Sequence, residues 1–128
     1  MMTKAAYAQA RIGMRLRRAY SRAELVVDAI VHILGLVVAV AAGSILLTLA
    51  LLQTAPEAFP ALAVYVATLV VVLGVSLAFN LWPNSPAKNF LARLDQAAIF
   101  LFIAGSYTPF LAVLGQTPSG VVMMSLVW

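Results

Sequence analysis

Three long stretches of the chain carry no formal charge, and short polar segments separate them. These stretches run over residues 29–52, 61–82 and 96–114, and they are 24, 22 and 19 residues long. A helix needs about 20 apolar residues to cross about 30 Å of hydrocarbon. Each stretch therefore predicts a transmembrane helix. A further apolar run starts at residue 118 and reaches residue 128, which is too short to span.

The pattern predicts an all-α, polytopic helical membrane protein. We expect three complete transmembrane helices and the start of a fourth, over residues of about 25–52, 61–82, 92–114 and 118–128. A short run at the end indicates a truncated bundle, and a short interfacial helix anchored by Trp128 is the alternative. Composition agrees with the class, because 9% of residues are charged and a soluble domain has about 25%. The chain has no cysteine, which excludes disulfides and thiolate metal ligands.

The first 22 residues form a separate basic segment ahead of the membrane domain at 23–128. This segment holds six of the eight basic residues and no acid. One stripe of a helical wheel holds Lys4, Arg11, Arg15, Arg18 and Arg22. The pattern predicts an amphipathic helix on an anionic lipid surface. A disordered basic tail and a transit peptide are the alternatives.

The charges also predict the orientation of the spans. Residues 1–28 carry a net charge of +4, the segment 53–60 carries −1 through Glu57, and the segment 83–95 carries +1. Short segments rich in Lys and Arg stay in the cytoplasm. We therefore expect the N-terminus and the segment 83–95 inside, and Glu57 outside. The expected partners are membrane lipids, and nucleic acid is not expected.

Polar residues gather at the predicted cytoplasmic ends of all three spans. Glu24, Asp28 and His32 follow each other at a spacing of four, as do Ser76 and Asn80, and Asp95 opens the third span. Ionisable groups within a membrane are costly and usually mark a functional site. Local roles are the alternatives. Glu24 could close a capping box, and the Asp residues could complement helix dipoles. His32 could be a buried imidazole that donates to a backbone carbonyl, and Asn80 could simply bridge helices.

The stretches ELVVDAIVHILG, SLAFNLWP and RLDQAAIFLFIAGSYTPFL resemble the hemolysin III family. That family is the bacterial branch of the progestin and adipoQ receptor superfamily. The resemblance covers roughly residues 20–114 and implies a bundle of seven transmembrane helices with a cytoplasmic N-terminus. The expected location is then the bacterial cell (inner) membrane.

The resemblance also implies a candidate zinc site. Glu24 and His32 match family residues of the first helix, Ser76 matches the family Ser of the second, and Asp95 matches the Asp that contacts zinc through water. The family's zinc-binding His of the second helix is replaced by Asn80. An Asn amide is a poor zinc ligand, which argues against tight binding. The remaining ligands belong to a His-x-x-x-His motif that these 128 residues do not contain.

Three functions follow from the resemblance. The first is a non-enzymatic, receptor-like or membrane-homeostasis protein with a cytoplasmic-side polar site. The second is a zinc-dependent membrane hydrolase acting on a lipid amide, as in ceramidases, with Asp95 as the catalytic residue. The third is a pore-forming hemolysin, although the three uncharged spans offer no polar stripe to line a pore.

Overall fold

A computed structural model describes residues 22–53, 56–115 and 117–128. The expected amphipathic segment at 1–22 lies outside these residues, apart from Arg22. The described chain is helical throughout, as predicted, and its elements are α2 (Arg22–Leu52), the short η1 (Pro56–Ala58), α3 (Phe59–Leu81), α4 (Pro86–Leu114) and α5 (Pro118–Val127). Of these, α2, α3 and α4 are long and apolar enough to cross a membrane.

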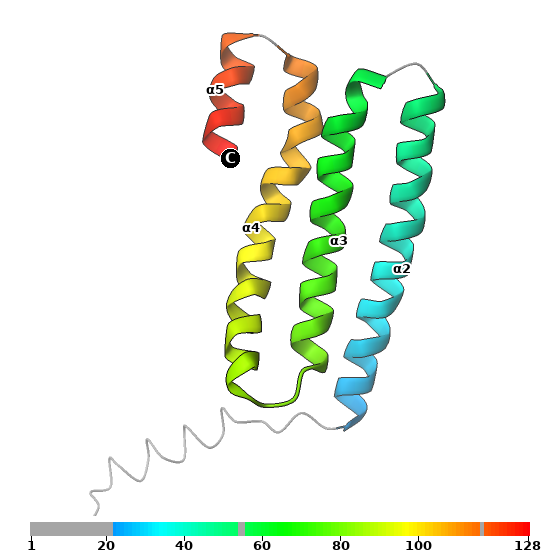
Figure 1. Ribbon diagram of the computed structural model, residues 1–128, viewed down its shortest axis with the longest axis vertical. Coiled ribbons are helices and arrows are strands. Elements are labelled where there is room, and N and C mark those ends of the chain that lie inside the picture. The colour runs from blue at the N-terminus through cyan, green and yellow to red at the C-terminus, as the bar shows by residue number, and fades with distance from the viewer. Residues whose placement is uncertain (1–21, 54–55, 116) are drawn as a thin grey trace, which may run out of the picture.

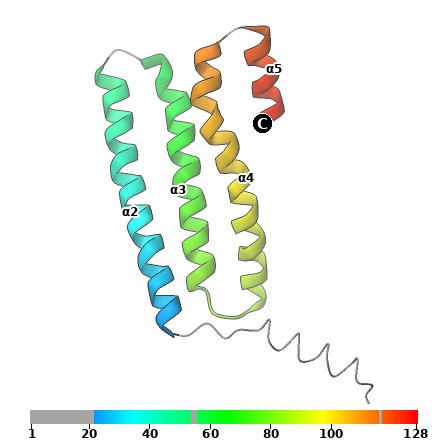
Figure 2. The same cartoon turned by 180° about the vertical axis from the view of Figure 1, so that it is seen from behind.

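The helices lie side by side in one layer (Figure 1). Helix α3 is in the middle, with α2 on one side and α4 on the other, and α5 folds back beside α4. The reverse view shows the same order (Figure 2). One end of the layer, called here the Arg22 end, holds the start of α2, the end of α3 and the start of α4. The opposite end, called the Glu57 end, holds η1 and the α4–α5 turn.

Helix α4 begins at Pro86, six residues before the expected start at 92. Ser85 precedes it in an extended conformation, and Pro occupies the first helical position, where its missing N–H costs no hydrogen bond. Lys88 then donates to the carbonyl of Trp82 at 3.1 Å. The charged segment is therefore mostly helix, and residues 82–85 alone form the connection.

Small residues let the three long helices approach each other. Gly43 of α2 lies against Val66 of α3, because a Cβ built on Gly43 would lie 2.5 Å from Val66 Cγ1. Gly105 of α4 lies against Thr68 of α3, where an added Cβ would lie 2.8 Å from Thr68 Cβ. Such close contacts drive helix association in lipid, where apolar burial contributes little. Large apolar side chains instead face outward, with Phe100 73% exposed.

Helix α5 is capped at its start and is joined to α4 at its end. Its first turn is capped by Thr117, whose side chain accepts from the Gly120 N–H at 3.2 Å. Beyond its last residue, the indole Nε1 of Trp128 donates to Thr108 Oγ1 of α4 at 3.0 Å. Trp128 therefore packs its polar edge against a neighbouring helix while 57% of the residue is exposed.

Candidate functional site

The polar residues of α2 and α3 meet near the Arg22 end of the layer. His32 of α2 lies against Ser76 and Asn80 of α3. The register follows from Gly35 of α2, which lies opposite Leu73 of α3. His32 precedes Gly35 by three residues, and Ser76 and Asn80 follow Leu73 by three and seven residues, toward the same end of the layer. Ser76 and Asn80 share a helix face because they are four residues apart. All three side chains are half-buried.

Both ring nitrogens of His32 are engaged. Nδ1 lies 2.7 Å from the carbonyl oxygen of Asp28, one turn earlier in α2. A carbonyl can only accept, so this contact assigns the proton to Nδ1. Nε2 is then the acceptor, with Ser76 Oγ at 3.1 Å and Asn80 Nδ2 at 3.3 Å. The three residues, called here the His32 network, join α2 to α3 through side-chain hydrogen bonds.

Asp95 of α4 lies at the same depth as the His32 network. Gly105 and Thr68 are in contact, Asp95 precedes Gly105 by ten residues, and Ser76 follows Thr68 by eight. At 1.5 Å per residue these steps are about 15 Å and about 12 Å toward the same end. Asp95 also shares the α4 face of Ala98 and Gly105, both of which are buried. It is half-buried, and within the described part of the chain no hydrogen bond or ion pair reaches its carboxylate.

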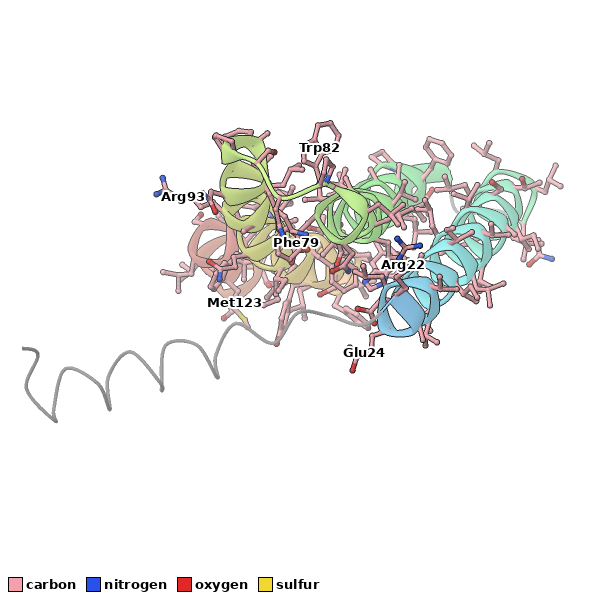
Figure 3. All side chains as sticks on the ribbon, turned by 90° about the horizontal axis from the view of Figure 1, so that it is seen from below. Arg22, Glu24, Phe79, Trp82, Arg93 and Met123 are labelled. Atoms are coloured by element: carbon pink, nitrogen blue, oxygen red, sulfur yellow. The ribbon has the colours of Figure 1, made fainter. Side chains whose placement is uncertain are left out.

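The two acidic residues of α2 lie differently. Asp28 takes part in the His32 network through its backbone carbonyl, and its side chain is half-buried. Glu24 is exposed and points away from the layer at the start of α2, whereas the Arg22 side chain lies on the α3 side of that helix (Figure 3). The structure thus brings together His32, Ser76 and Asn80, with Asp95 level with them, and leaves Glu24 apart.

The residues present do not fit a zinc ion. No group of three or more His, Cys, Asp or Glu side chains that could hold a metal occurs among residues 22–53, 56–115 and 117–128. His32, the chain's single His, already uses Nε2 as the acceptor for Ser76 and Asn80. At position 80 the amide donates a hydrogen bond where a ligand would need to offer a lone pair. His32, Ser76 and Asn80 therefore form hydrogen bonds with one another, and they do not form a metal-binding group.

Two features of this region were not predicted from the sequence. The ammonium of Lys88 lies 5.4 Å from the centre of the Phe79 ring, and it donates to the Trp82 carbonyl. The hydroxyl Oγ of Ser85 is buried and has no partner among the described residues. The sequence contains a hint of the Lys88 contact with Trp82, since a Lys two residues after the Pro that begins a helix can reach back over the preceding turn.

Comparisons with known proteins agree with the fold. The family described as Haemolysin-III related matches residues 21–128. Hemolysin-3 of Bacillus cereus is 29% identical over 105 residues, which is 82% of this chain and 48% of that protein. The chain therefore spans about half the length of this curated relative. The search of solved structures found no significant match. The family match covers most of the chain and includes all of its described helices, so this integral membrane protein belongs to the haemolysin III family.

Proposed function

We propose that this chain is a non-enzymatic member of its family, a receptor-like or membrane-homeostasis protein whose cytoplasmic-side polar site holds helices together. The observation that carries the proposal is the hydrogen bond from Asn80 to His32 Nε2. It occupies the lone pair that a metal would need, and it places an amide donor where the family resemblance has a ligand. Polar contacts between helices in lipid are worth about 0.6 kcal/mol each. The His32 network therefore helps to hold α2 and α3 in one arrangement.

Metal analysis of the purified protein tests this proposal. We expect far less than one zinc per chain after purification without chelator, because the described residues supply no three-ligand site. The same protein loaded with excess zinc and then desalted should lose it again. One zinc retained per chain after desalting would contradict the proposal and favour a metal-dependent enzyme.

A lipid amide hydrolase is the second candidate, and the position of Asp95 favours it. A half-buried carboxylate with no ion pair among the described residues could hold and deprotonate a water molecule. If the protein hydrolyses ceramide-like amides, Asp95→Asn should abolish that activity while the melting temperature stays unchanged, because the two side chains have the same shape. An Asp95→Asn variant as active as the parent would remove Asp95 from the chemistry.

The orientation in the membrane is a further part of the proposal. We expect the Arg22 end in the cytoplasm and the Glu57 end outside, because Lys and Arg flank the Arg22 end alone. The chain has no cysteine, so Glu57→Cys and Asn89→Cys each give a single labelling site, and both positions are exposed. An impermeant maleimide should label position 57 in intact cells and position 89 only after permeabilisation. The reverse pattern would invert the topology.

A further inference from the structure

Two adjoining cavities lie along α3 and α4 toward the Glu57 end, and Leu46 of α2 also lines the second. The first has a volume of about 410 Å³ and opens beside Glu57, with Ala61 and Ala112 among its walls. The second, of about 460 Å³, is lined by apolar and aromatic side chains that include Tyr65 and Phe102. The two share Leu62 and Pro109. Ligand sites typically have about 300–1,000 Å³, so together they form a ligand-sized groove.

Glu57 gives this groove a negative charge that no described residue compensates. The residue is exposed, and no ion pair reaches it within the described part of the chain. All eight basic residues lie at positions 4–22, 88 and 93. Those at 22, 88 and 93 belong to the initial turns of α2 and α4, and these turns lie at the opposite end of the layer (Figure 1). The segments on either side of the groove mouth, 53–60 and 112–118, contain no Lys or Arg. A cationic group is therefore the complementary occupant.

The rest of the groove is suited to a hydrocarbon chain. From Glu57 to Tyr65 the chain advances eight residues, or about 12 Å along the helix direction, so the second cavity lies within the hydrocarbon depth of the membrane. Small side chains at positions 61 and 112 leave the mouth open, and the rings of Tyr65 and Phe102, with centroids 6.1 Å apart, form the inner wall. An occupant that satisfies both parts is an amphiphile with a cationic head at the membrane surface.

We propose that this groove binds a phospholipid with a primary ammonium headgroup, such as phosphatidylethanolamine, with the ammonium on Glu57 and one acyl chain along Leu62 toward Phe102. A primary ammonium can donate hydrogen bonds to a carboxylate, and such charge-assisted bonds are strong. A quaternary ammonium cannot donate and is usually recognised by aromatic faces. Among the described residues, no aromatic ring lines the cavity at Glu57. The site is independent of the His32 network at the other end.

Native mass spectrometry of the protein released from detergent micelles tests the proposal. The protein is mixed in turn with phosphatidylethanolamine, phosphatidylcholine and phosphatidylglycerol of identical acyl chains. We expect the most bound lipid with phosphatidylethanolamine, and a loss of about tenfold in its affinity for Glu57→Gln, as one charge-assisted hydrogen bond implies. Glu24→Gln is the matched control, because this residue is exposed at the opposite end, and it should leave binding unchanged.

A second variant tests the mouth of the groove without touching the charge. Ala112→Leu enlarges an exposed wall residue and should lower binding of phosphatidylethanolamine while the melting temperature stays as in the parent. Equal binding of the three lipids, or a Glu57→Gln variant that binds phosphatidylethanolamine as well as the parent does, would overturn the proposal. Unchanged binding by Ala112→Leu would also overturn it, because the lipid would then not enter through this mouth.

Discussion

Gly105→Ala is expected to destabilise the protein by about 1–3 kcal/mol, the usual cost of overpacking a tight contact. The added Cβ would lie 2.8 Å from both Cβ and Cγ2 of Thr68 and closer still to its hydroxyl oxygen. Thr68 is buried and its hydroxyl is held by the carbonyls of Val64 and Tyr65 at 3.0 Å. The side chain therefore cannot turn away cheaply, and α3 and α4 must separate. Thermal unfolding in detergent micelles measures the loss.

Gly74→Ala is the matched control for this prediction. A Cβ at Gly74 would meet nothing within 4 Å, and an Ala in a helix is favoured over Gly by up to about 1 kcal/mol. This variant should be as stable as the parent or slightly more stable. A double variant with Thr68→Ala should recover part of the loss of Gly105→Ala, because the two atoms beyond Thr68 Cβ are removed. Equal melting temperatures for Gly105→Ala and Gly74→Ala would show that the helix crossing is looser than described.

The spans could be predicted from the sequence because charge is costly in hydrocarbon. Three uncharged stretches were sufficient to locate α2, α3 and α4. The start of α4 was misplaced, because Lys88 was interpreted as part of a charged connection ahead of the third span. A helix can carry such residues where it emerges from the membrane, since long basic side chains reach the interface from within a helix. Hydropathy therefore locates the buried part of a helix better than its end.

The candidate site was predictable in its depth but not in its contacts. The spacings of His32, Ser76 and Asn80 predicted polar groups at one end of the spans. Which of them touch depends on how each helix is rotated about its axis, and that rotation is set by Gly35, Gly43 and Gly105 against α3. A spacing of four does not by itself predict a contact between helices. Ser44 and Thr48 of α2 have this spacing, but both are exposed and donate to carbonyls of their own helix at 2.7 and 2.8 Å.

The cavities at the Glu57 end had only a weak signal in the sequence. Ala58 directly follows a lone acid at 57 and Ala61 lies four residues after that acid, yet small residues along a helix more often allow helices to pack closely. The space arises because Pro109 and Ala112 of α4 face them across the layer. A pattern along one helix cannot show what the neighbouring helix leaves empty.

Asn80→His is expected to give the protein a zinc-dependent gain in stability that the parent lacks. The amide nitrogen of Asn80 lies 3.3 Å from His32 Nε2, so an imidazole at position 80 would point a second lone pair toward the same space. Two imidazoles are fewer than the three protein ligands of a catalytic site or the four of a structural one, so the affinity should rise without becoming tight. At a zinc concentration 100 times the dissociation constant, the gain should be about 2.7 kcal/mol.

The measurement is the melting temperature with zinc and again after addition of a chelator, for Asn80→His and for two controls. Leu81→His places the same ring one residue further on, where the side chain is 56% exposed, and zinc should not stabilise it. Adding His32→Ala to Asn80→His should remove the effect, because a single imidazole then remains in the chain. An equal zinc response in Leu81→His and Asn80→His would mean that a ligand at position 80 does not face His32. The hydrogen bond between Asn80 and His32 would then be no argument against a metal site.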